Sequence, residues 1–161
     1  MEKEFIDLIN NNRALIFKVC NLYCGDIESR RDLFQEVVLQ VWKSFPGFRK
    51  EAANSTWIYR IALNTAISNF RKESKRPAKQ ALDMTAFEIP DMSDTANDHE
   101  NIRKLSRAIK ELTEIEKAII LLYLDEKSYE EISDIIGISI SNVGVRLNRI
   151  KNKLSEIIKT Y

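Results

Sequence analysis

Histidine and cysteine are scarce in this chain, and this limits the chemistry that it can perform. The single histidine is His99, in a polar segment, and the only cysteines are Cys20 and Cys24. Zinc sites need clusters of these residue types, so we expect no zinc site. The two cysteines are one helical turn apart, which is poor disulfide geometry, and a reducing compartment is therefore predicted. The sequence also lacks a nucleophile–base pair and a phosphate-binding glycine loop, so we expect neither an enzyme nor a cofactor.

Helix breakers and long apolar runs are also scarce. Four glycines and three prolines leave few interruptions, while a hydrophobic content of 44% is enough to build a core. The longest apolar run, residues 118–124, is too short to cross a bilayer, so no membrane insertion is expected. The first eight residues, MEKEFIDL, are acidic and have no signal-peptide pattern. We therefore expect an all-α, cytoplasmic protein.

The formal net charge of +1 conceals an uneven distribution of charge along the chain. Residues 51–76 are basic, residues 77–100 are acidic, and from residue 136 onward Glu156 is the only acid among several lysines and arginines. Basic segments of this kind suit contacts with nucleic acid. The acidic stretch also has two prolines and no sustained periodicity, so residues 77–97 are predicted to be a linker. The predicted domains are therefore residues 1–76 and 98–161.

Residues 128–154 have the pattern of a helix-turn-helix. Ser128 and Glu131 form a capping box that predicts a helix from the next residue, and Gly137 is placed to end it. Ser139 can cap a second helix, in which an apolar stripe recurs at spacings of four, three and four. This buried stripe is predicted to comprise Val143, Leu147, Ile150 and Leu154. A neighbouring stripe carries Asn142, Arg146, Arg149 and Lys153, as a DNA-reading helix would need. An ordinary helical hairpin with a solvated basic face is the alternative.

The rest of the chain is predicted to be helical, with a break in the linker. Amphipathic patterns indicate helices over residues 3–24 and 29–45, with a possible break in the first at Asn10–Asn12. In the second, the predicted buried face is Leu33, Phe34, Val37, Val38, Val41, Trp42 and Phe45. A third helix, capped by Ser55 or Thr56, is expected to reach residue 76, followed by helices over residues 98–112 and 113–124.

Three blocks in this order resemble the extracytoplasmic-function group of bacterial RNA polymerase sigma factors. DLFQEVVLQVWKSF (residues 32–45) is similar to the family's polymerase-docking helix, and STWIYRIALNTAISNFRK (residues 55–72) to its promoter-melting and −10-recognition helix. Residues 112–154 are similar to its fourth region, which reads the −35 element. The resemblance implies two helical domains, binding to the polymerase β′ clamp helices and β flap, promoter DNA recognition and, in some members, an anti-sigma partner.

The resemblance also implies roles for individual residues. Those expected to bind core polymerase are Asp32, Gln35, Glu36 and Gln40. Those expected to contact or melt the −10 element are Phe48, Arg49, Lys50, Asn54, Trp57, Arg60, Asn64, Arg71 and Lys72. Those expected at the −35 element are Ser139, Ser141, Asn142, Arg146, Arg149, Lys151 and Lys153, with base reading by Asn142 and Arg146. The residues expected to bind core polymerase could instead form an ordinary solvated surface, and Trp57 could instead be a residue of the hydrophobic core.

Two other functions stay open on sequence grounds. A DNA-binding regulator with a helical sensing or dimerisation domain would share the pattern of residues 112–154, although an α/β receiver does not fit the helical first half. A helical adaptor that binds only protein would leave the basic faces without a purpose. The acidic linker has two interpretations as well. By its resemblance to the family it would thread through the path that RNA takes in the polymerase, or it could simply tether the two domains.

Overall fold

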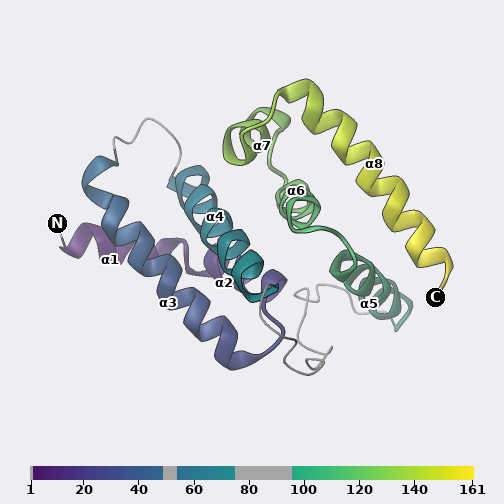
Figure 1. The fold of residues 1–161 in the computed structure, drawn as a ribbon, viewed down its shortest axis with the longest axis horizontal. Helices are drawn as coiled ribbons and strands as arrows, with labels where there is room; N and C mark the ends of the chain where they lie inside the picture. Colours follow the sequence, from purple (N-terminus) through teal and green to yellow (C-terminus); the bar gives the residue numbers. More distant parts are fainter. Residues whose placement is uncertain (1, 49–53, 75–95) are drawn as a thin grey trace. The chain divides into compact units, whose positions relative to one another are not determined.

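The computed structural model describes residues 2–48, 54–74 and 96–161 (Figure 1). Among these residues every regular element is helical, so the all-α prediction is confirmed. The chain divides into two compact units, residues 1–86 and 87–161. The first contains α1 (Glu2–Asn11), α2 (Arg13–Tyr23), α3 (Ile27–Ser44), a 3₁₀ turn η1 (Phe45–Gly47) and α4 (Asn54–Ser74). The second contains α5 (Ala96–Lys110), α6 (Glu114–Leu124), α7 (Tyr129–Ile136) and α8 (Ile140–Lys159).

The first predicted helix is broken in two at Asn12. Its side-chain amide donates a 2.8 Å hydrogen bond to the Leu8 carbonyl, one of the acceptors that the end of α1 leaves without a helical partner. The chain then restarts as α2, with Asn12 at the N-cap position. The break that the run of three asparagines predicted is therefore present, because the amide side chain competes with the backbone for these hydrogen bonds.

The core of the first unit is formed where α2, α3 and α4 pack together. Its fully buried side chains include Ile16 and Val19 on α2, Val37 on α3, and Ile58 and Tyr59 on α4. Burial of large side chains like these is the main force that holds three amphipathic helices together. Asp26 starts α3 by accepting a 3.1 Å hydrogen bond from the Ser29 amide, two residues earlier than predicted.

The predicted buried face of α3 was too wide. Leu33, Val37 and Val41 are buried, but Trp42 is 42% exposed and Phe34 and Val38 are only half-buried. The indole of Trp42 packs edge-on against Phe5 of α1, with ring centroids 4.8 Å apart. Phe34 stacks on Phe17 of α2, with ring centroids 4.7 Å apart, so the outer part of this face is covered by aromatic rings at the edge of the core.

The helices of the second unit begin and end close to the predicted positions. Thr113 and Ser128 each form a complete capping box, with Glu116 and Glu131 respectively. Gly137 ends α7 with a left-handed φ of 84°, a conformation that costs glycine little. The buried stripe of α8 is the predicted one of Val143, Leu147, Ile150 and Leu154. The segment predicted as a linker lies outside the described residues, apart from its last two positions, which begin α5.

No helix in the described part of the chain has both the length and the apolar character required to cross a membrane.

Candidate nucleic-acid and protein interfaces

The turn between α7 and α8 holds the two helices of the helix-turn-helix in a fixed geometry. Ser139 accepts a 3.1 Å hydrogen bond from the Asn142 amide and so caps α8. The Ser133 hydroxyl donates to the Ile138 carbonyl across the turn. Because both ends of the turn are hydrogen-bonded, the start of α8 is rigidly placed, as a recognition helix needs. Ser139 therefore has a structural role, in addition to any DNA contact.

The outward ridge of α8 lies at a different angle from the predicted reading face. Successive residues of a helix are about 100° apart around its axis, so the residues that lie opposite the buried stripe can be identified. Most of them are not among the residues predicted to contact DNA. These ridge residues, all exposed, are Ser141, Val145, Asn148, Arg149 and Asn152. The predicted base readers Asn142 and Arg146 are half-buried on its flank. A pattern of basic residues beside an apolar stripe does not select Val145, Asn148 and Asn152, whereas their angle from the centre of the buried stripe predicts that they are exposed.

The two lysines further along α8 contact α6. Lys153 Nζ lies 2.9 Å from Glu116 Oε1, the same carboxylate that accepts a 2.9 Å hydrogen bond from the Thr113 amide. Lys151 Nζ is 3.0 Å from the hydroxyl of Tyr123 and 4.3 Å from the centre of its ring. Both were predicted to contact the −35 element. In this structure they join α8 to α6, so any phosphate contact competes with these internal partners.

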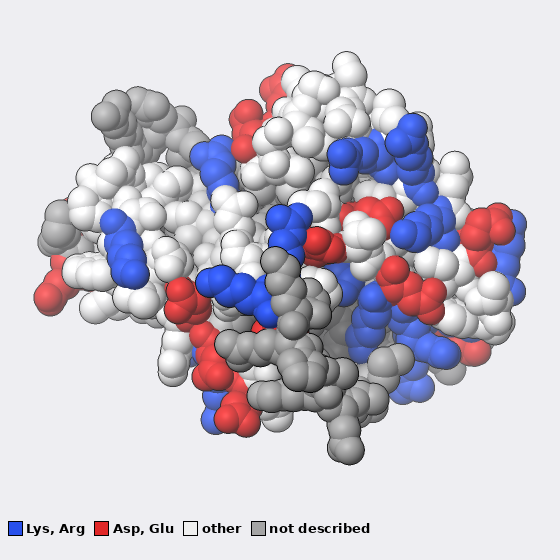
Figure 2. All heavy atoms as spheres, in the orientation of Figure 1, with Lys and Arg blue, Asp and Glu red and all other residues white. Residues whose placement is uncertain are grey.

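Glu116 is the central residue of that connection. Burial opposes its charge, but the hydrogen bonds from Thr113 and Lys153 outweigh burial and lower the pKa of the carboxyl group below its ordinary value. The carboxylate therefore stays ionised at neutral pH, and it stabilises both the start of α6 and the position of α8. Figure 2 shows blue basic side chains in the region of α8, with uncharged side chains at the outer edge of its first half and charged ones toward its C-terminal end.

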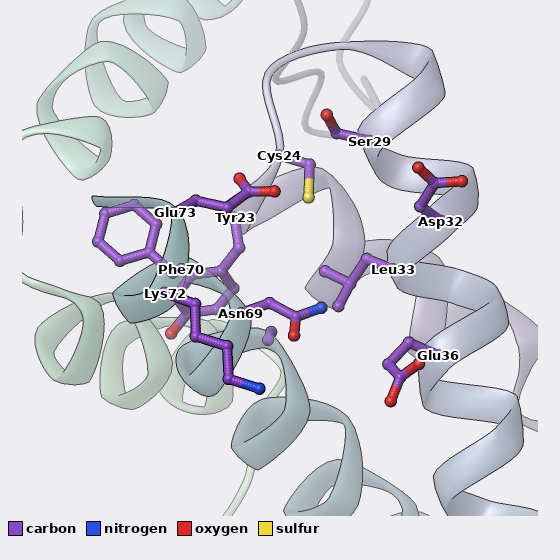
Figure 3. A pocket seen from close by; sticks show the side chains of 11 residues that line it. Tyr23, Cys24, Ser29, Asp32, Leu33, Glu36, Asn69, Phe70, Lys72 and Glu73 are labelled. Atoms are coloured by element: carbon purple, nitrogen blue, oxygen red, sulfur yellow. The ribbon is translucent and has the colours of Figure 1, made fainter. Parts of the chain in front are cut away.

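The predicted polymerase-docking residues lie together on α3. Asp32 and Gln35 are exposed, while Glu36 and Gln40 are half-buried and joined by a 3.0 Å hydrogen bond from the amide of Gln40 to the carboxylate of Glu36. Asp32 and Glu36 line one side of a pocket of about 340 Å³. Figure 3 shows the opposite side, where Asn69 points from α4 toward α3. The pocket is also lined by Tyr23, Cys24, Ser29, Leu33, Ala66, Phe70, Lys72 and Glu73.

The two thiols belong to Cys20 on α2 and Cys24 at its C-cap, and both are held in the neutral form, which is the less reactive one. Burial raises the pKa of Cys20 to about 12 and that of Cys24 to about 11, and for Cys24 the carboxylate of Glu73 adds to the effect. Both cysteines are free, as predicted. The described residues contain no group of three His, Cys, Asp or Glu side chains able to hold a metal ion.

An apolar groove runs along the other side of the docking residues. It has a volume of about 460 Å³ and is lined by Phe5, Phe34, Gln35, Val38, Leu39 and Trp42. Gln35 therefore borders this groove, whereas Asp32 and Glu36 border the polar pocket. The surface of α3 thus offers charged and apolar contacts side by side, as protein–protein interfaces do.

The predicted −10 residues of α4 share its outward face. Asn54, Asn64, Arg71 and Lys72 are exposed and Arg60 is half-buried, whereas the buried residues of α4 lie on the opposite side. Trp57 is half-buried and stacks on Phe48, with ring centroids 4.4 Å apart and an interplanar angle of 28°. Trp57 is therefore not a fully buried core residue. Arg49 and Lys50 lie outside the described residues.

Each of the two units matches a known protein family. Residues 8–76 match Sigma-70 region 2 and residues 102–154 match Sigma-70, region 4. The chain is 32% identical to "ECF RNA polymerase sigma-E factor" of Escherichia coli K12, over 84% of this chain and 77% of that protein. It is 25% identical to "ECF RNA polymerase sigma factor SigW" of Bacillus subtilis, over 96% of this chain and 89% of that protein. The sigma factor RpoE of Bartonella quintana, solved with the anti-sigma factor NepR, has the same fold, with a TM-score of 0.71, 20% identity and 98% of each chain covered.

Proposed function

Because this chain belongs to the extracytoplasmic-function group of RNA polymerase sigma factors, we propose that it binds core RNA polymerase and recognises the −10 and −35 elements of its promoters. It directs transcription initiation and catalyses no covalent step itself. The observation that carries the proposal is the combination of the two matched regions with two exposed polar helix faces, one on α4 and one on α8. Residues 1–76 would act at the −10 element and residues 98–161 at the −35 element.

Core polymerase would dock on α3. Asp32 and Glu36 supply carboxylates on the wall of the polar pocket, and Gln35 lines the apolar groove. Cations on the β′ clamp helices can form charge-assisted hydrogen bonds with the carboxylates, while apolar side chains fill the groove. Gln40 would contribute mainly by holding Glu36 in place through its 3.0 Å hydrogen bond. The second unit would in turn contact the β flap.

The −10 element would be opened and held by α4 and the loop before it. A base that leaves the duplex needs an aromatic surface for stacking and polar groups for its Watson–Crick edge. The stacked pair of Phe48 and Trp57 provides the first, and Asn54 and Asn64 provide amides on the same face of α4. Arg60, Arg71 and Lys72 would contact phosphates, and binding of the unpaired strand would offset the cost of unpairing.

The −35 element would be read by α8 in the major groove. Ser141, in the first turn of α8, lies where backbone N–H groups favour a phosphate, and Arg149 projects from the outward ridge. Arg146 and Asn142 would reach base edges from the flank of this ridge, as guanidinium and amide groups do with guanine and adenine. We place this activity in the cytoplasm, where polymerase and chromosomal DNA are found.

An anti-sigma protein is a further partner to test, because the solved neighbour from Bartonella quintana is in complex with one. The linker between the two units is proposed to thread into the polymerase.

The test is transcription in a purified system. Core polymerase is supplied with a library of promoter fragments, with and without the chain, and the transcripts are sequenced. We expect a set of start sites that depends on the chain and shares two sequence elements at a fixed spacing. Transcripts that are unchanged by the chain would exclude a sigma factor. DNA binding without core polymerase, combined with no new start sites, would instead favour a conventional regulator.

A further inference from the structure

Val145 is an unusual residue on the outward ridge of α8. Its side chain is 47% exposed, and its neighbours one turn before and after it are Ser141 and Arg149. A β-branched residue is a poor helix former, and exposure to water gives its methyl groups no compensation. A contact with a surface outside the chain would compensate for both costs.

The surroundings of Val145 show which kind of surface covers it. The nearest exposed apolar side chain on the same helix, Ile140, lies about 140° around the helix axis, so the two do not form one patch. The ridge around Val145 is polar, with Asn148 and Asn152 continuing it. A protein partner would require a contiguous apolar area, which is absent from this ridge of α8. The ridge is better matched by a polar partner surface, in which one small apolar group lies among hydrogen-bond donors and acceptors.

The DNA major groove has that composition. Among the four bases only thymine presents a methyl group there, between the hydrogen-bonding edges of neighbouring bases. From these observations we propose that Val145 reads the C5-methyl group of a thymine in the −35 element. The inference rests on the proposed function and adds to it a specificity residue that makes no hydrogen bond. Asn148 and Arg149 would bind the neighbouring base edges or phosphates and so fix the position of the valine.

The contact predicts a defined loss when only the methyl group is removed. Burial of one methyl group against a valine should strengthen binding roughly fourfold. Replacing thymine by deoxyuridine deletes this group and leaves every hydrogen-bonding atom in place. Val145→Ala shortens the side chain from the protein side, and alanine is well tolerated in an exposed helix. The two changes should therefore not be additive, because each removes the same contact.

The experiment uses the full-length chain bound to core polymerase. Its preferred −35 sequence is first selected from a randomised pool, and each thymine of that sequence is then replaced by deoxyuridine, one at a time. We expect one position at which deoxyuridine weakens promoter binding roughly fourfold for the parent and not at all for Val145→Ala. Val145→Ile should keep the dependence on thymine, and Asn152→Ala is the matched control from the same ridge. Circular dichroism confirms that each variant is folded.

Three results would overturn the proposal. These are a preferred element without thymine, a parent protein that tolerates deoxyuridine at every position, and a Val145→Ala variant that keeps the full sensitivity. In each case a sequence preference at −35 would still support the proposed function. A parent holoenzyme with no preference at all in this region would overturn both proposals, so the two failures are distinguishable.

Discussion

Removal of the Glu116 carboxylate should loosen the second unit while leaving the first unchanged. The Oε1 atom of Glu116 accepts hydrogen bonds from the Thr113 amide and from Lys153 Nζ, both at 2.9 Å. A capping hydrogen bond at an exposed helix start is worth about 0.5–1.5 kcal/mol. The ion pair adds only about 0.2–1 kcal/mol, because the Lys153 side chain is 44% exposed and the pair is screened by solvent. Glu116→Ala should therefore cost about 1–2 kcal/mol of local stability.

Hydrogen exchange followed by mass spectrometry can locate this loss. A change of about 1 kcal/mol accelerates exchange roughly fivefold where exchange requires local opening, so the amides of α6 and α8 should exchange several-fold faster in Glu116→Ala. Trp42 and Trp57 both lie in the first unit, and their fluorescence is therefore an internal control that should not change. Lys153→Ala should have a smaller effect, and the double mutant should show a coupling of about 0.2–1 kcal/mol.

The stability of the second unit should also depend on pH through the hydrogen bonds of Glu116. The pKa of Glu116 is lower in the folded chain than its ordinary value of 4.5. Its stabilising contribution should then be present above pH 4.5 and disappear as the pH falls through the folded-state pKa. Unchanged exchange in Glu116→Ala at pH 7, or additive effects of the two single mutants, would refute a connection between α6 and α8 through this carboxylate.

Three further predictions follow from other parts of the structure. Asp32→Ala combined with Glu36→Ala should weaken core polymerase binding by about 1.5–3 kcal/mol per lost charged contact without reducing helicity, and co-purification equal to the parent would exclude docking on α3. Leu147→Ala removes a fully buried side chain of α8 and should cost about 2–5 kcal/mol in thermal or urea unfolding, whereas Asn148→Ala beside it should cost little. Cys24, with its pKa raised to about 11, should react slowly with thiol reagents at pH 8 until the first unit unfolds, and rapid labelling of the folded chain would contradict its burial.

The sequence was most informative where a structural signal is local. Both capping boxes and the left-handed Gly137 involve residues within a few positions of one another, so a short stretch of sequence determines them. The buried stripe of α8 was predictable for the same reason, because helical periodicity alone fixes which residues share a face.

Contacts between distant residues could not be predicted in this way. Lys153 and Glu116 are 37 positions apart, so nothing in the local pattern indicates that a lysine predicted at DNA would contact the start of α6. Trp42 was assigned to the core because apolar periodicity does not reveal whether another helix covers the outer part of a face. Val145 was not selected as a candidate DNA contact, since the pattern of basic residues beside an apolar stripe does not include an exposed valine.

The polar pocket of the first unit is shared by the proposed docking surface on α3 and the proposed DNA-binding helix α4. Asp32 and Glu36 of the proposed docking surface line it, and so do Lys72 and Glu73 near the end of the proposed DNA helix (Figure 3). Opposite charges within one small volume influence each other's free energy, so a cation that approaches the carboxylates also changes the field at Lys72. By thermodynamic reciprocity, if polymerase alters the affinity of α4 for DNA, then DNA alters the affinity for polymerase by the same factor. If polymerase raises the affinity of α4 for DNA, release of the promoter lowers the affinity of the chain for polymerase by the same factor.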